Sequence, residues 1–216
     1  MTVRIAPSLA SAPLDRLGQV ISELEKAGAD YIHFDVEDGV FTPVMTLGIK
    51  IIGDLRSLTT KPFDVHLMTV NPEWLIPILA TSGANRIAVH FEACPYPRRT
   101  LRKVVELGMI AGIALNPATD LPNLSYLLPY LSYVILLSSE PEEPDCPFIT
   151  DVMDKLRRGK SQNSLRNLEW VIDGGINEEN CEEVLQSGAD TLVIGRAVFK
   201  DGNIIENMEK LRRITK

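Results

Sequence analysis

The three histidines of this 216-residue chain stand at the ends of short apolar segments, and each has an acidic residue close by. In His33-Phe34-Asp35 the two polar side chains are two positions apart, so on a strand they point to the same face. His66 follows a second apolar segment, and Asp173 ends another. Two imidazoles and two carboxylates suit Zn²⁺, Fe²⁺, Mn²⁺ or Co²⁺. We predict one divalent-metal site at His33, Asp35, His66 and Asp173; the alternative is that each is an ordinary hydrogen-bonded or helix-capping residue.

Two further motifs lie at the same kind of position. His90-Phe91-Glu92 repeats the spacing, which fits either a residue behind the metal ligands or a hydrogen-bonded rim histidine. Asp173-Gly174-Gly175 offers bare backbone N–H groups ahead of a predicted helix, an arrangement that commonly binds phosphate. Gly195-Arg196 ends the last apolar segment and adds a guanidinium. We predict that Gly174, Gly175, Gly195 and Arg196 contact an anionic substrate group, whereas a tight turn with a solvated arginine is the alternative.

Eight short apolar segments are the candidate strands that position these residues, and helical patterns such as Leu14–Ala27 and Asn180–Ser187 separate them. Gly28, Gly83 and Gly188 each follow a helical stretch, where glycine ends a helix in the left-handed conformation. The expected strands are Arg4–Leu9, Tyr31–Val36, Phe63–Leu67, Arg86–Phe91, Ala111–Leu115, Tyr133–Ser138, Leu168–Ile172 and Thr191–Gly195.

Repetition of one strand–helix unit predicts an α/β protein, a (β/α)8 TIM barrel forming a single domain over residues 1–216. A doubly wound open sheet is the alternative. In the barrel all the polar positions above lie at the carboxyl ends of the strands, where such enzymes carry their active sites.

Composition narrows the classes of partner. A formal charge of −7 and a pI near 5.1 argue against nucleic-acid binding, because an acidic surface repels phosphate backbones. No apolar run approaches the roughly 18 residues of a membrane span, and the first residues lack the pattern of a signal peptide. The three cysteines are scattered without CxxC spacing, which fits reduced thiols. We therefore expect a cytoplasmic protein without nucleic-acid or membrane partners.

Five motifs occur in order along most of the chain: Ile5-Ala6-Pro7-Ser8, His33-Phe34-Asp35-Val36, Asp64-Val65-His66-Leu67-Met68, Ala114-Leu115-Asn116-Pro117-Ala118-Thr119 and Asp173-Gly174-Gly175-Ile176-Asn177. This series, over about residues 5 to 200, resembles the ribulose-phosphate 3-epimerase family. The resemblance implies a metal-binding isomerase of carbohydrate metabolism, a barrel that acts on a small-molecule sugar phosphate and commonly forms a homo-oligomer. It also implies that the counterparts of Asp35 and Asp173 are acid and base, and that Ser8 contacts substrate. We further predict substrate contacts for His66 and Met68, with an ordinary core methionine as the alternative for Met68.

The implied chemistry suits these residue types. Inverting a carbon beside a ketone requires removing a proton from one face and returning one to the other, which two carboxylates on opposite sides can do. The metal acts as a Lewis acid that stabilises the enediolate. No nicotinamide or flavin is required.

Three departures from the family pattern concern substrate recognition. The glycine-rich loop of the family is replaced by Glu140-Pro141-Glu142-Glu143-Pro144-Asp145-Cys146, which should not hold a phosphate dianion. Arg196 replaces a serine, and its charge could offset that loss. Glu37 and Leu137 replace methionines, while Met68 remains. We predict D-ribulose 5-phosphate or a close analogue as substrate, with D-allulose 6-phosphate as the alternative.

Two other classes of protein share features with this chain. Phosphate-binding decarboxylases and lyases on similar barrels use an Asp-x-Lys-x-x-Asp arrangement, but neither Asp35-Val36-Glu37-Asp38 nor Asp64–Met68 contains a lysine. A non-catalytic sugar-phosphate-binding paralogue would explain the acidic Glu140–Asp145 loop. Retention of both aspartates and both ligand histidines argues against it.

Overall fold

Eight parallel strands form the centre of the molecule. The computed structural model describes residues 3–141 and 147–215. The strands are hydrogen-bonded in the order β1-β8-β7-β6-β5-β4-β3-β2, and a backbone bridge between Ser8 and His33 joins the two end strands. Their bounds are β1 Arg4–Pro7, β2 Ile32–Glu37, β3 Phe63–Met68, β4 Arg86–His90, β5 Ile110–Leu115, β6 Leu131–Leu137, β7 Glu169–Asp173 and β8 Thr191–Ile194.

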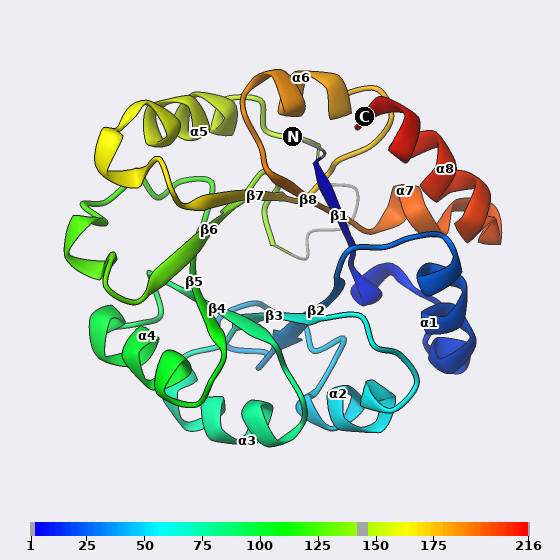
Figure 1. The fold of residues 1–216 in the computed structure, drawn as a ribbon, viewed down its shortest axis with the longest axis horizontal. Helices are drawn as coiled ribbons and strands as arrows, with labels where there is room; N and C mark the ends of the chain where they lie inside the picture. The colour runs from blue at the N-terminus through cyan, green and yellow to red at the C-terminus, as the bar shows by residue number, and fades with distance from the viewer. Residues whose placement is uncertain (1–2, 142–146, 216) are drawn as a thin grey trace.

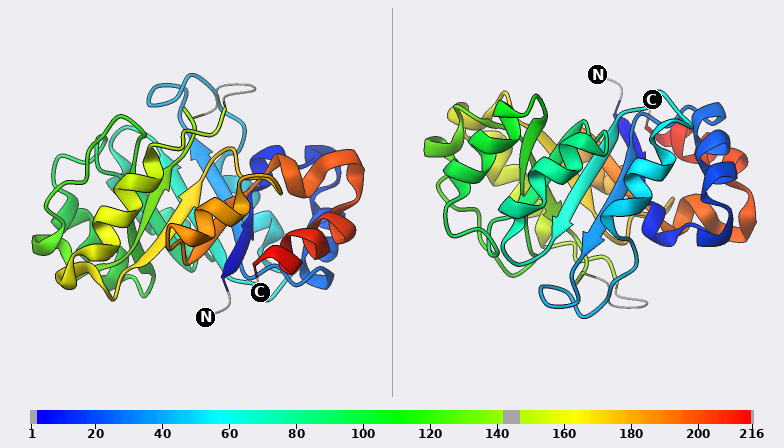
Figure 2. Two further views of the ribbon diagram at one scale, coloured as in Figure 1. Left: turned by 90° about the horizontal axis from the view of Figure 1, so that it is seen from above. Right: turned by 90° about the horizontal axis from the view of Figure 1, so that it is seen from below.

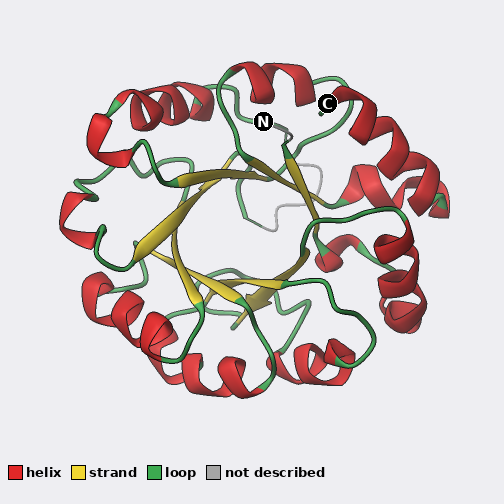
Figure 3. Ribbon diagram, viewed as in Figure 1, coloured by secondary structure: helices red, strands yellow, loops and turns green. Residues whose placement is uncertain are grey.

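Helices surround the strands as an outer ring (Figures 1 and 3). This arrangement confirms the predicted (β/α)8 barrel and excludes the open sheet. Each observed strand lies within two residues of its predicted bounds. The helices are α1 Leu17–Lys26, α2 Ile49–Arg56, α3 Ile76–Thr81, α4 Pro97–Glu106, α5 Val152–Ser161, α6 Cys181–Gln186, α7 Arg196–Phe199 and α8 Ile204–Ile214.

The connection between β5 and β6 departs from the regular repeat. Residues 116–130, all of them described, contain the short 3₁₀ turn Ser125–Leu127 and no α-helix. Pro117, Pro122 and Pro129 interrupt this stretch, and each removes a backbone donor that a helix interior needs. The segment Tyr126–Tyr133 therefore comprises the end of the 3₁₀ turn and the start of β6, with no α-helix end.

Glycines end the helices as predicted. Gly28, Gly83 and Gly188 have φ values of 75°, 89° and 101°, in the left-handed region that residues with a Cβ avoid. Each lies two residues after the last residue of its helix. The chain can therefore turn sharply from α1, α3 and α6 into the next strand.

The barrel interior is filled by side chains of matched size. Ala6, Ala88 and Ala114 leave space that the buried ring of Tyr133 occupies. A Cβ at Gly112, on the neighbouring strand β5, would lie 2.4 Å from that ring. Only glycine fits opposite the tyrosine, so Gly112 and Tyr133 form one packing unit that closes the middle of the barrel.

A charged network closes the amino-terminal end of the interior. The buried Arg86 guanidinium lies 3.0 Å from Asp64 Oδ1 and 3.1 Å from both carboxylate oxygens of Glu169. It also stacks 3.7 Å from the centroid of the Tyr133 ring. Asp64 and Glu169 lie on β3 and β7, so Arg86 on β4 connects strands across the barrel.

The termini lie at this same end, opposite the long loop between β2 and α2 (Figure 2). Among the described residues, no helix is both long and apolar enough to cross a membrane.

Candidate metal and substrate site

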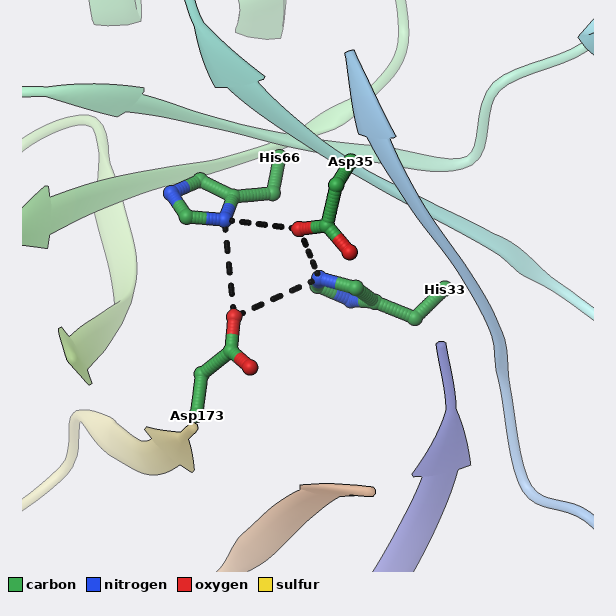
Figure 4. A group of neighbouring side chains, drawn as sticks. All are labelled: His33, Asp35, His66 and Asp173. Carbon is green, nitrogen blue, oxygen red and sulfur yellow. Dashed lines mark hydrogen bonds and ion pairs between the residues drawn. The ribbon is translucent and has the colours of Figure 1, made fainter. Parts of the chain in front are cut away.

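The four predicted metal ligands come together at the carboxyl end of the barrel (Figure 4). His33 Nε2 and His66 Nδ1 lie 3.2 and 3.1 Å from Asp35 Oδ1. The same nitrogens lie 3.6 and 3.5 Å from Asp173 Oδ2. All four ligand atoms are within 4.8 Å of one another, so one ion with bonds of about 2.0–2.2 Å can reach them with small shifts.

Strand register explains the convergence. His33 and Asp35 are two positions apart on β2 and face inward together. Asp35 pairs directly with His66 in the parallel ladder between β2 and β3. Asp173 is the last residue of β7 and approaches from across the barrel. Because every ligand is on a strand, the rigid sheet holds the group in place.

Hydrogen bonds on the far side of each ring determine which nitrogen faces the ligand group. His33 Nδ1 lies 2.9 Å from Asp64 Oδ2, and a carboxylate only accepts, so Nδ1 carries the hydrogen. The lone pair of His33 Nε2 is then directed at the ligand group. His66 has its Nδ1 toward the group and its Nε2 toward His90.

The electrostatics of the group favour positive charge between the carboxylates. Burial opposes charge on Asp35, but the charges and hydrogen bonds of His33 and His66 hold its pKa well below the ordinary value. Burial raises the pKa of Asp173, and the nearby charge of Asp35 adds to this. Burial lowers the pKa of His66, yet Asp173 and Asp35 outweigh it and raise that pKa to about 9. Protons and a divalent cation therefore compete for the same atoms.

A cavity of about 660 Å³ opens above the ligand group. Asp35 and Asp173 line it, together with six of the seven predicted substrate-binding residues; those six are Ser8, Met68, Gly174, Gly175, Gly195 and Arg196. The seventh, His66, is fully buried within the ligand group and does not line the cavity. The volume falls within the range of small-molecule sites.

Ser8 connects the cavity wall to one aspartate. Its hydroxyl donates to Asp35 Oδ2 at 2.6 Å, and its Oγ accepts from the amide of Ala10. Asp35 therefore uses one oxygen toward the histidines and the other toward Ser8. Ser8 thus lies beside Asp35 on the cavity wall, and its contact with substrate stays a prediction.

Two glycines leave backbone exposed where side chains would not fit. Gly174 has a φ of 111°, and a Cβ there would lie 2.3 Å from Ser139 Oγ. A Cβ at Gly195 would lie 2.3 Å from Ser11 Oγ. These positions need glycine for the close approach of β7 and β8 to their neighbours. Ser11 and Ser139 also line the cavity, and sequence reasoning did not single them out.

Lys200 is a second cation on the cavity wall that the sequence analysis missed. It lies four residues after Arg196, and both side chains are exposed at the β8 side. The four-residue spacing on a short helical turn could have identified it. Glu178 and Glu179 line the same cavity, so the two cations share it with carboxylates.

The other departures from the family pattern, Leu137, Glu37 and the acidic loop, differ in where they lie. Leu137 lines the cavity, as does Glu140 at the start of the acidic loop. Glu37 does not line the cavity, although it replaces a methionine that lines the site in the family. Its carboxylate turns away and accepts a hydrogen bond from the amide of Thr46 in the β2–α2 loop. The remainder of the acidic loop, Glu142–Cys146, lies outside the described residues.

Comparison with known proteins agrees with the site. A sequence profile described as the ribulose-phosphate 3 epimerase family matches residues 4–199. A ribulose-phosphate 3-epimerase of Synechocystis sp. is 42% identical over 212 residues, covering 96% of this chain and 92% of the relative. The enzyme of that name from Bacillus subtilis is 37% identical, covering 97% and 98%.

A solved structure of 3-hexulose-6-phosphate synthase from Salmonella typhimurium has the same fold. It superposes with a TM-score of 0.72 at 14% identity and covers 99% of this chain and 98% of that one. At this identity the likeness concerns the barrel alone. The family match and the identities above 30% over nearly the full length are more specific, and by them the chain belongs to the ribulose-phosphate 3-epimerase family.

Proposed function

We propose that the chain is a metal-dependent ketose-phosphate 3-epimerase that interconverts D-ribulose 5-phosphate and its C3 epimer. The observation that carries the proposal is the pair of carboxylates, Asp35 and Asp173, which both line the cavity and both belong to the candidate metal group. The names of the relatives point to the same reaction.

The donor set fits a divalent cation. Two imidazole nitrogens and two carboxylate oxygens converge, and the hydrogen bond to Asp64 directs a lone pair of His33 inward. His33, Asp35, His66 and Asp173 would hold the ion. When bound, it would supply Lewis-acid stabilisation of negative charge that develops on the ketone oxygen.

Proton transfer is assigned to the two aspartates. They stand on β2 and β7, on opposite sides of the ligand group (Figure 4). A substrate bound between them presents one face of C3 to each carboxylate. One removes the C3 proton and the other delivers a proton to the opposite face, and the roles exchange in the reverse direction. Ser8, through its hydrogen bond to Asp35 Oδ2, keeps that carboxylate oriented.

Phosphate recognition is assigned to the β7 and β8 side of the cavity. Gly174 and Gly175 leave their backbone uncovered there, and Arg196 and Lys200 supply positive charge. Glu140 and Pro141, at the β6 side, provide an acidic group and a residue without an N–H. The phosphate dianion is therefore expected nearer Arg196 than the β6 loop.

Solvent-deuterium exchange tests the proposal. Purified protein of measured metal content is incubated in D₂O with D-ribulose 5-phosphate, and deuterium at C3 is followed by NMR. We expect exchange to fall by about 10²–10⁴-fold in the Asp173→Asn variant and to persist in Asp154→Asn, a surface control on α5. Metal-loaded wild-type protein that leaves the C3 proton in place would contradict the proposal.

D-allulose 6-phosphate is the second candidate substrate, because Leu137 on the cavity wall stands where the family has a methionine. The same exchange experiment with the hexulose decides between the two. Exchange confined to the hexulose would assign the chain to that substrate. Exchange in neither would favour a sugar-phosphate-binding paralogue without catalysis.

We also predict that the protein works in the cytoplasm. Cys94 and Cys181 are both buried free thiols, as expected in a reducing compartment.

A further inference from the structure

The outer nitrogen of His66 lies against a third histidine that the reaction scheme above does not use. His66 Nε2 is 2.9 Å from His90 Nε2, and the two rings are inclined at 27° with centroids 4.9 Å apart. Both rings are fully buried. At this separation one hydrogen lies between the two nitrogens, and the partner on the far side of His90 determines which nitrogen carries it.

That partner is a carboxylate. His90 Nδ1 lies 3.1 Å from Glu92 Oε2, and because an ionised carboxylate only accepts, His90 Nδ1 carries a hydrogen. A neutral His90 then has its lone pair on Nε2 and accepts from His66 Nε2–H. In a neutral His66, the form that binds a metal ion, Nδ1 then carries no hydrogen and faces Asp35 and Asp173. The opposite arrangement would place an N–H where a metal ligand needs a lone pair.

Glu92 is itself held by neighbouring elements. Its Oε1 accepts from the amide of Asn116 at 2.7 Å and from the hydroxyl of Thr119. Lys155 of α5 holds the loop that contains these groups. Its ammonium donates to the carbonyls of Asn116 and Pro117 at 3.0 Å. Phe41 of the β2–α2 loop also packs against the His90 ring, with centroids 4.5 Å apart.

We propose that His90 and Glu92 are positioning residues for the metal site, which fix the tautomer and orientation of His66 through the chain Glu92–His90–His66. The inference rests on the proposed metal-dependent function, and its tests measure metal affinity and ring protonation separately from catalysis. His90 contacts no ligand atom of the group; it acts through His66. Asp64 fixes the tautomer of His33 directly, without a second histidine between them.

A matched series at position 90 separates hydrogen bonding from packing. His90→Phe keeps an aromatic ring under Phe41 but removes the acceptor for His66 Nε2–H. His90→Gln offers an amide oxygen as a replacement acceptor. We expect the Kd for Co²⁺, measured by competition with a chromophoric chelator, to rise about 10–100-fold in H90F and to recover most of that loss in H90Q. Glu73→Gln is the control, because Glu73 accepts from Arg99 and Thr100 on α4 and lies outside this chain of hydrogen bonds.

Ring NMR on the wild-type protein tests the tautomers without any substitution. In protein labelled with ¹⁵N-histidine and loaded with Zn²⁺, we expect His66 to carry its hydrogen on Nε2 and His90 on Nδ1. Should H90F fail to fold, this spectrum and the H90Q and Glu92→Gln affinities decide the question. We expect E92Q to weaken Co²⁺ binding, because the NH₂ group of the glutamine can donate to His90 Nδ1. The direction of the hydrogen bonds between residue 92, His90 and His66 would then be reversed.

The outcomes are distinct from those of the proposed reaction. Wild-type Co²⁺ affinity in folded H90F, or a hydrogen on His90 Nε2 in the loaded wild type, overturns the inference. So does a wild-type protein that binds no divalent cation. Metal-loaded protein with the expected tautomers that leaves the C3 proton unexchanged would instead contradict the proposed function and leave the positioning role standing.

Discussion

The two ends of the barrel interior both hold buried acids, but they balance the charge differently. At the amino end, Asp64 and Glu169 are paired with Arg86, and Glu169 also meets Arg4 at 3.3 Å. At the carboxyl end, the ion pairs that Asp35 and Asp173 make within the described part of the chain involve only His33 and His66. The amino end carries its own permanent cations, whereas under the proposed function the carboxyl end would take its positive charge from a bound metal ion.

The ion pairs at the amino end stabilise the fold, whereas the polar groups at the carboxyl end belong to the candidate site. Charge balance at the amino-terminal end of a barrel serves the fold, while groups at the carboxyl rim serve chemistry. Asp64 links the two ends, because its Oδ1 faces Arg86 and its Oδ2 accepts from His33. The network that stabilises the amino end thus also orients one ligand at the carboxyl end.

Removing the fixed cation should have the largest effect on stability. Arg86→Met leaves Asp64 and part of Glu169 buried without their partner, which we expect to lower the free energy of unfolding by about 3–5 kcal/mol. Arg4→Met is the control, because Arg4 pairs with the same Glu169 but its side chain is 41% exposed, and we expect less than about 1 kcal/mol. Denaturant unfolding measures both. Equal losses in the two variants would mean that the buried network gives the amino end no special stability.

The carboxyl end should behave in the opposite way. Asp173→Asn is expected to reduce C3 exchange by about 10²–10⁴-fold, because a general acid–base group is lost. In the presence of a chelator its free energy of unfolding should not fall, since one of two neighbouring buried charges is removed. Exchange rates and denaturant unfolding on the same preparation provide the comparison. A variant that is both active and less stable would place Asp173 among the structural acids, with Asp64.

The features that could be predicted from the sequence are those set by residues close together in the chain. Polar residues at the ends of apolar segments identified the ligand group, and Gly28, Gly83 and Gly188 marked the helix ends, because both signals depend on neighbours in the chain. The Arg86–Glu169 pair joins residues 83 positions apart on β4 and β7. Nothing near either residue in the sequence indicates its partner, so the amino-terminal network appears only in three dimensions.

The same reasoning accounts for the misjudged and missed residues at the carboxyl end. Glu37 was expected beside the substrate because it replaces a methionine of the family pattern, but its carboxylate accepts a hydrogen bond from the Thr46 amide in the β2–α2 loop and turns away. His90-Phe91-Glu92 showed the spacing of a strand pair, yet its two interpretations could be separated only by the position of His90 against His66. Tertiary hydrogen-bond partners decide side-chain direction at strand ends, where regular alternation stops.

Acid should destabilise the carboxyl end through Glu92. Burial opposes the charge of Glu92, but hydrogen bonds from His90, Thr119 and Asn116 lower its pKa from 4.5 to about 2. The unfolded chain therefore binds a proton before the folded one does, so the stabilisation is complete above about pH 4.5 and is lost as the pH falls towards 2. We expect a contribution on the order of 2–3 kcal/mol, with a flatter stability curve between those pH values in E92Q. Parallel curves for the two proteins would contradict this assignment.

The smallest expected effect concerns the exposed cation at the substrate end. Arg196→Ser restores the residue that the family commonly has there and removes a charge that lines the cavity. Because a phosphate contact far from C3 is made equally in the ground and transition states, we expect the KM for D-ribulose 5-phosphate to rise about tenfold with kcat unchanged. Arg157→Ser, which removes a half-exposed arginine of α5, is the control. A kcat loss without a KM change would instead place Arg196 near the reacting carbon. Unlike Arg86, which is buried against fixed acids and supports the fold, Arg196 is exposed and should act only when an anionic substrate is bound.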